Sequence, residues 1–199
     1  MQTITALFDD YEDASDAVSE LEAMGMPISD ISIVANNADS RHHNVASPAA
    51  EDAATGAGIG AVVGGAGGLA TGLGAMAIPG LGPVVAAGWL AAMAAGAVAG
   101  AVAGGAAGGI IGGLTDAGVP ENDAHVYAEG VRRGGTLVTA RVDEDVALQV
   151  REILSSSRSV DIGERRSEYE AGGWAAFDPA AGTYSVDDIE RDAARRRGL

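Results

Sequence analysis

Hydrophobic and polar residues alternate along residues 2–8 and again along residues 31–35. Alternation places the apolar side chains on one face, which is typical of a half-buried β-strand. Between these stretches, apolar residues recur at helical spacing over residues 14–24, after Asp9 and Asp10 and before a glycine. Aspartates favour a helix N-terminus and glycine favours a helix end. The pattern predicts a strand, a helix and a second strand, with the two aspartates supplying the N-cap and favourable charge.

A similar order of patterns returns near the other end of the chain. Pro120 is expected to open a short helix, and residues 137–142 form a strand. A helical pattern over residues 146–154 then leads to a last strand around Val160 and Ile162. Two strand–helix–strand units of this size usually combine as a ferredoxin-like sandwich, a four-stranded antiparallel sheet with helices on one face. We therefore expect an α+β fold of this kind, interrupted by an insertion.

The expected insertion contains residues 53–115, which carry no charged side chain and which we call the charge-free segment. Two sets of five glycines recur there every four positions, so that each set forms one stripe along an α-helix. Residues 77–83, between the sets, have the proline and glycine content of a tight connection. Glycine stripes let helix backbones approach closely. The segment therefore predicts a glycine-zipper helical hairpin with these packing residues: Gly56, Gly60, Gly64, Gly68, Gly72, Gly96, Gly100, Gly104, Gly108 and Gly112.

The predicted limbs of this hairpin, residues 53–77 and 84–114, would both exceed the bilayer core of about 30 Å at about 1.5 Å per residue. Glycine and alanine contribute little transfer free energy, however, and the flanking residues are acidic rather than basic. Two alternatives stay open: a soluble hairpin that packs on other subunits, and a hairpin that enters a membrane. With either alternative we expect a homo-oligomer.

Pattern and charge together divide the chain into six parts. We expect the following: 1–37, first half of the ferredoxin-like domain; 38–52, polar linker; 53–115, hairpin; 116–133, connecting helix; 134–164, second half of the domain; 165–199, C-terminal tail. The net charge of −16, with twelve arginines and no lysine, excludes a general nucleic-acid-binding protein. The first residues lack a basic stretch followed by a long apolar one, so we expect no secretion. The expected location is the cytoplasm or the inner membrane, with the α/β domain in the cytoplasm.

Residues that could carry chemistry are few in this sequence. Asp39, His42 and His43 could ligate a metal ion, but adjacent histidines point in different directions and cysteine is absent. The glycine string at 58–64 follows a polar linker rather than a strand, unlike a dinucleotide-binding motif. The Arg132-Arg133 pair is too small for an anion site. We expect no enzyme, no cofactor and no metal, and identify no small-molecule ligand.

The C-terminal tail contains three aromatic residues in an otherwise polar stretch, Trp174, Phe177 and Tyr184. We hypothesise that they dock on a neighbouring subunit, the alternative being a loosely ordered tail. Ser185 could cap a short helix that ends at the arginines 195–197.

Three stretches, residues 5–14, 77–83 and 118–138, resemble the bacterial heat-induced general stress proteins, whose small α/β domain is interrupted by a Gly-rich hydrophobic segment. The likeness covers about residues 3–163, and the tail looks like an extension found on some relatives. It implies a stress-associated protein of undefined biochemical activity and supplies no catalytic residues. We expect a non-enzymatic protein that self-assembles through the hairpin; the alternative is a regulatory small-molecule-binding module built on a ferredoxin-like domain.

Overall fold

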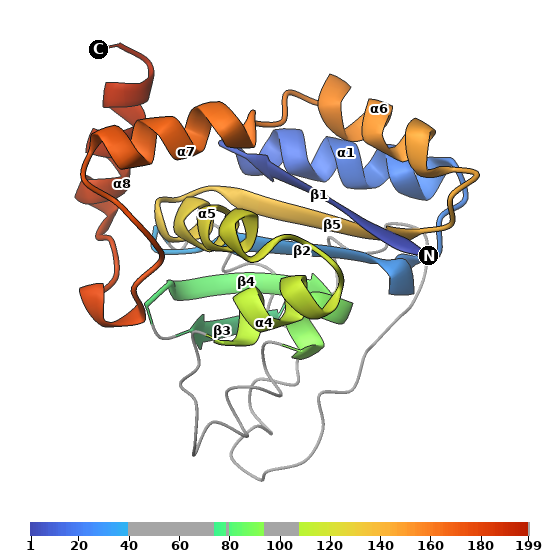
Figure 1. The fold of residues 1–199 in the computed structure, drawn as a ribbon, viewed down its shortest axis with the longest axis horizontal. Coiled ribbons are helices and arrows are strands. Elements are labelled where there is room, and N and C mark those ends of the chain that lie inside the picture. Colours follow the sequence, from blue (N-terminus) through green and yellow to red (C-terminus); the bar gives the residue numbers. More distant parts are fainter. Residues whose placement is uncertain (40–73, 79, 94–107, 199) are drawn as a thin grey trace, which may run out of the picture.

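The computed structural model describes residues 1–39, 74–78, 80–93 and 108–198 (Figure 1). Helices and strands follow one another along these residues as an α+β fold. The elements are β1 (Gln2–Phe8), α1 (Tyr11–Ala23), η1 (Ile28–Asp30), β2 (Ile31–Asn36), β3 (Gly74–Ile78), β4 (Gly82–Gly88), α4 (Gly108–Asp116), α5 (Glu121–Arg132), β5 (Thr136–Val142), α6 (Ala147–Ser156), α7 (Ile162–Ala171), η4 (Pro179–Ala181) and α8 (Val186–Arg196).

The strands form a five-stranded antiparallel sheet in the order β1-β5-β2-β4-β3. β5 lies between β1 and β2, so the β1–α1–β2 unit encloses a strand that comes 100 residues or more later in the sequence. The register places Thr5 opposite Thr139, Thr139 opposite Ser32, and Ser32 opposite Gly88. Both strands of the predicted first unit are confirmed, as are the helix between them, the strand at β5 and the helices at α5 and α6.

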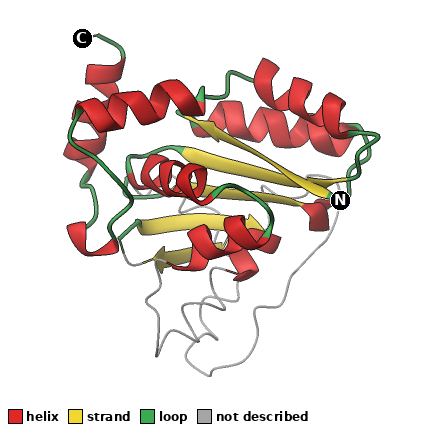
Figure 2. Ribbon diagram, in the orientation of Figure 1, coloured by secondary structure: helices red, strands yellow, loops and turns green. Residues whose placement is uncertain are grey.

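Helices cover both faces of the sheet, whereas the sequence predicts helices on one face (Figure 2). Phe8 points into a core shared with α1 and α6, and Leu7 points into a second core shared with α4 and α5. Both side chains are 0% exposed. Neighbouring residues of a strand face opposite ways, so one strand contributes to two apolar layers. Burying side chains of this size stabilises the fold by about 2 kcal/mol each.

The predicted helical limbs are wrong for residues 74–77 and 84–88, which belong to the strands β3 and β4. The tight connection itself is confirmed: Gly80 and Gly82 have φ angles of +81° and +93°, and the Leu81 N–H donates to the Ile78 carbonyl at 3.0 Å. Val84 and Val85 then face the two different cores. β-branched residues on alternate faces fit a strand, and pairing with β2 satisfies the backbone of β4.

Two of the ten predicted packing glycines lie in a described helix, Gly108 and Gly112 in α4. A Cβ built on Gly112 meets no described atom within 4 Å, whereas one on Gly113 would lie 2.8 Å from Leu90 Cδ1. Among the described residues, the close approach therefore occurs at Gly113, one position after the predicted packing residue Gly112. The other eight glycines lie outside the described residues, so their role stays a prediction: Gly56, Gly60, Gly64, Gly68, Gly72, Gly96, Gly100 and Gly104.

Within the described ranges, no helix is both long enough and apolar enough to cross a membrane.

The strand predicted around Val160 and Ile162 is replaced by the start of α7. Asp161 is the N-cap of this helix, and its Oδ1 accepts a hydrogen bond from the Glu164 N–H at 2.9 Å. The Val160 N–H donates to the Leu7 carbonyl at 2.7 Å, which places this residue beside the edge strand β1. The chain therefore contacts the edge of the sheet at Val160 and then begins a helix. The helix is favoured because the Asp161 carboxylate accepts a hydrogen bond from a backbone N–H in the first turn of α7.

Candidate functional site

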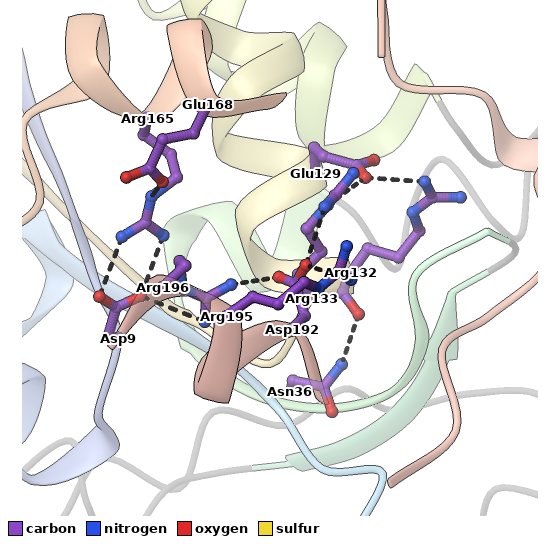
Figure 3. Close-up of polar contacts among 10 residues, drawn as sticks. All are labelled: Asp9, Asn36, Glu129, Arg132, Arg133, Arg165, Glu168, Asp192, Arg195 and Arg196. Carbon is purple, nitrogen blue, oxygen red and sulfur yellow. Dashed lines mark hydrogen bonds and ion pairs between the residues drawn. The ribbon is translucent and has the colours of Figure 1, made fainter. Parts of the chain in front are cut away.

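The four charged residues that are buried in the described part of the chain lie together where α5, α7 and α8 meet (Figure 3). Their ion-pair partners come from the same three helices and from the residue after β1. We call this group the ionic network; it consists of Asp9, Glu129, Arg132, Arg133, Arg165, Asp192 and Arg196.

Glu129 is the most deeply buried member of the ionic network, with a side chain that is 0% exposed. Its Oε1 atom accepts hydrogen bonds from Arg132 Nη2 at 2.7 Å and from Arg133 Nε at 2.6 Å. The helix places both guanidinium groups there, because residues three and four positions apart share one face. Two cations around one carboxylate offset the large cost of removing that charge from water. Glu129 therefore holds the Arg132 and Arg133 side chains in place at the end of α5.

Asp192 connects this end of α5 to α8. Its Oδ1 atom accepts from Arg133 Nη1 at 3.2 Å and from Arg195 Nη2 at 3.2 Å, and its other oxygen pairs with Arg196. Burial alone would lower the pKa of Arg133, but the hydrogen bond and charge of Glu129, with Tyr184 and Asp192, raise it above the usual value. The guanidinium group of Arg133 thus stays charged between the two helices.

Asp9 connects the ionic network to the start of α1. Arg165 donates two hydrogen bonds of 2.9 Å to the two oxygens of Asp9, and Arg196 lies 3.5 Å from Oδ1. Burial raises the pKa of Asp9, but Arg165 and Arg196 outweigh this effect and hold it below its ordinary value. The sequence predicts that Asp9 and Asp10 cap α1; Asp10 is the N-cap of this helix but makes no side-chain cap hydrogen bond. The Asp9 carboxylate instead binds α7.

The three aromatic residues of the C-terminal tail pack on their own chain. Phe177 is 6% exposed and lies 5.7 Å from the Arg132 guanidinium carbon, measured to the ring centre. The Tyr184 ring lies near both Arg132, at 5.1 Å, and Arg133, at 5.4 Å. Trp174 contacts Tyr169 edge to face, with ring centres 5.6 Å apart. The alternative of a loosely ordered tail is wrong for these residues, and docking on a neighbouring subunit stays a hypothesis.

The tail also lies against the turn between β3 and β4. A Cβ built on Gly80 would lie 2.5 Å from Pro179 Cα and 3.1 Å from Phe177 Cζ, and one on Gly82 would lie 3.3 Å from Thr183. Larger residues at this turn would push the tail away. The turn belongs to the charge-free segment, so the tail contacts that segment directly.

The chemistry of the ionic network favours attachment over catalysis. With Glu168, whose Oε2 lies 3.2 Å from Arg165 Nε, and with Arg195, which pairs with Asp192, the ionic network joins four carboxylates to five guanidinium groups. Arg132 and Arg133 are thus already paired. His125 accepts the Phe177 N–H through Nδ1 at 3.3 Å. Across the described ranges, no three His, Asp or Glu side chains gather where they could hold a metal ion; His42 and His43 lie outside those ranges.

A second candidate site is a hollow of about 300 Å³ at the other end of the sheet. Its lining includes Thr3, Trp89, Asp116 and Arg141. The Arg141 guanidinium carbon lies 5.0 Å from the Trp89 ring centre, and Arg141 Nη2 donates to Asp30 at 3.0 Å. An aromatic face, a cation and a carboxylate at one hollow could bind a small polar molecule.

Comparison of the chain with protein-family models, with curated proteins and with solved structures finds no significant match.

Proposed function

We propose that the chain is a non-enzymatic, stress-associated protein that self-assembles through its charge-free segment, in the cytoplasm or at the inner membrane. The observation that carries this proposal is how the segment is joined to the domain. Its strand β4 pairs with β2, and its helix α4 packs on α5, both within one apolar core. In this proposal the domain anchors the charge-free segment, and the remaining Gly- and Ala-rich residues mediate self-assembly. The stress association comes from the family resemblance.

Glycine spacing supports assembly through helix packing. A glycine in a helix interior costs about 1 kcal/mol relative to alanine, so ten of them at fixed spacing require a compensating contact. Close packing of helix backbones supplies such a contact. Gly112 in α4 has room beside it, because no described atom lies within 4 Å of a Cβ built there. We propose that a zipper helix, from the same chain or from a second copy, packs against this open face of α4.

The domain itself is proposed to be a variant of the ferredoxin-like sandwich. The arrangement of β1, α1 and β2 around β5, with α6 following β5, supports this topology. The hydrogen bond from the Val160 N–H to the Leu7 carbonyl lies at the β1 edge of the sheet, where the fourth strand of a ferredoxin-like sandwich would pair. In this proposal the glycine-zipper hairpin is inserted after β2. It is shorter than the sequence predicts, because some of its predicted residues form β3 and β4.

The test compares two double variants. Replacing Gly64 and Gly104 by Leu adds bulk on the predicted stripes, and replacing the neighbouring Gly65 and Gly105 by Leu adds the same bulk beside them. Sedimentation velocity should show a changed oligomer for the first pair and a much smaller change for the second. Equal behaviour of both variants and the unmodified chain would refute assembly through the zipper. Carbonate washing of cell membranes then separates integral from peripheral and soluble protein.

The alternative is a regulatory module that binds a small molecule, favoured by the hollow beside Trp89 and Arg141. A thermal-shift screen against metabolites discriminates, because a ligand raises the melting temperature by mass action. Trp89→Leu should abolish a shift that arises at this hollow. A screen without any shift would count against the module.

A further inference from the structure

We propose that the part of the C-terminal tail after α7, residues 173–198, is a latch that restrains self-assembly. It docks on the β3–β4 turn and holds the middle of the charge-free segment on the domain, so that its release promotes assembly. This inference rests on the proposed function and adds its regulation.

The latch contacts the β3–β4 turn directly. Phe177 belongs to the same apolar core as Ile78, the last residue of β3, and Leu81, which lies in the turn. Pro179 lies against Gly80, and Thr183 lies against Gly82. Two glycines of the turn are therefore covered by the latch rather than by another element of the sheet. Detachment of the latch uncovers an apolar turn whose residues are now 2% to 3% exposed, Leu81 and Ile78.

The latch buries few of its side chains against the domain. Of residues 173–198, only Phe177 and Asp192 are buried. Arg132 Nη1 adds a hydrogen bond to the Gly182 carbonyl at 3.3 Å, and Ile189 covers Gly134. Segments with few buried apolar contacts detach at a lower free-energy cost than the whole fold requires to unfold. The latch can therefore open while the sheet stays intact.

A hinge at Gly173 joins the latch to α7. Gly173 follows the end of α7 with a φ of +87°, and a Cβ built there meets nothing within 4 Å. Only glycine adopts such a conformation without strain. α7 remains tied down on the other side of this hinge by the pair between Arg165 and Asp9. Movement about Gly173 would release α8 and η4 without displacing α7.

The ionic network sets how tightly the latch is held. Asp192 is the one buried carboxylate of the latch among the described residues, and Arg133 is its partner on α5. Asp192→Asn keeps the size of the side chain but removes the carboxylate that joins α8 to Arg133, while Arg133 keeps Glu129 and Arg196 keeps Asp9. Because both arginines keep another carboxylate, the loss of this one pair should make detachment about tenfold more frequent.

The experiment uses the full chain with Asp192→Asn, and Asp187→Asn as control. Asp187 lies on the same helix, is exposed and has the same charge, but it belongs to no ion pair of the network. Hydrogen exchange over residues 174–190 measures latch release, and sedimentation velocity over a concentration series measures assembly. We expect Asp192→Asn to exchange faster and to assemble at a concentration at least severalfold lower, while Asp187→Asn matches the unmodified chain. A chain that ends at Gly172 should assemble as readily as Asp192→Asn.

The outcomes separate this proposal from the proposed function. If the chain assembles and the Gly64/Gly104 variant changes that assembly, but latch release leaves the concentration dependence unchanged, the latch is refuted and the proposed function stands. If no variant assembles at any concentration, both are refuted. If the shortened chain fails to fold, Asp192→Asn alone decides, because its exchange pattern reports directly on the latch.

Discussion

Asp9 and Arg165, 156 positions apart in the sequence, are joined by two hydrogen bonds of 2.9 Å each. This bidentate pair fastens α7 to the end of β1, and Arg196 extends it to α8. The paired geometry fixes both the distance and the orientation of the helix. The C-terminal tail is thereby ordered by the first strand of the chain.

Acid should weaken this pair in a defined window. The Asp9 pKa is lower in the folded chain than its ordinary value of 3.8, so the carboxylate stabilises the fold at neutral pH. That contribution is lost as the pH falls below about 4 and through the lowered pKa. Because the Asp9 side chain is 42% exposed, we expect only about 1 kcal/mol at pH 7. Urea unfolding of Asp9→Asn should show this deficit at neutral pH and a shrinking deficit in acid. An exposed control, Asp16→Asn, should show no such deficit; a deficit for Asp9→Asn that persists in acid would contradict the assignment.

Alkali should act on Tyr127, whose hydroxyl donates to the Thr5 carbonyl at 3.2 Å. Burial, with a smaller effect from Asp123, raises the pKa of Tyr127 to about 12. The unfolded chain loses this proton near pH 10, so the stabilisation is complete below pH 10 and is lost as the pH rises toward 12. Tyr127→Phe should cost about 1 kcal/mol at neutral pH through the lost hydrogen bond. Urea unfolding at about pH 8 and about pH 11 should show the gap between Tyr127→Phe and the unmodified chain closing in alkali. A constant gap would contradict the raised pKa.

Alanine substitutions at Gly88 and Gly118 distinguish a steric clash from backbone strain. Both have left-handed φ angles, +89° and +91°. A Cβ on Gly88 would lie 2.2 Å from the Ile31 carbonyl oxygen, whereas one on Gly118 meets nothing within 4 Å. Gly118→Ala should cost about 1 kcal/mol through strain alone. Gly88→Ala should cost several times more, since β4 must move away from β2. Similar midpoints in urea for the two variants would disprove the close contact of β4 with β2.

Glu129 is expected to be the most sensitive charge in the chain. Glu129→Gln leaves the buried Arg132 without its carboxylate and Arg133 with Asp192 alone, which should destabilise the fold by about 3 kcal/mol. Glu152→Gln, on the exposed side of α6, removes the same charge and should change stability by less than about 0.5 kcal/mol. Thermal unfolding followed by circular dichroism compares the two. A loss at Glu129 as small as that at Glu152 would mean that the ionic network contributes little.

Local patterns predict much of the domain. Alternation is enough to find β1 and β2, and Ser185 caps α8 in a capping box with Asp188, as the sequence suggests. The helical limbs are predicted too far toward the turn, over residues 74–77 and 84–88, where β4 pairs with β2 and β3 instead. The Val84-Val85 pair, directly after the turn, is the signal that favours a strand. The start of α7 is also readable in retrospect, since Asp161 precedes Glu164 by three residues, as at many helix N-termini.

The ionic network could be predicted only in part. The spacing of Glu129 to Arg132 and Arg133 identifies an ion-paired helix face from the sequence alone. The pairs of Asp192 with Arg133 and of Asp9 with Arg165 join distant parts of the chain. Many arginines and aspartates could pair equally well, so only the folded arrangement selects these partners.

Assembly through the charge-free segment is the property on which the proposed function rests. The most direct measurement is sedimentation equilibrium of the intact chain, with a monomer mass of 19.7 kDa, across a wide concentration range. We predict a mass that rises with concentration to a multiple of the monomer, and a shift of this rise when Gly64 and Gly104 are replaced by Leu. A mass of one monomer at every concentration, in solution and in mild detergent, would contradict the claim.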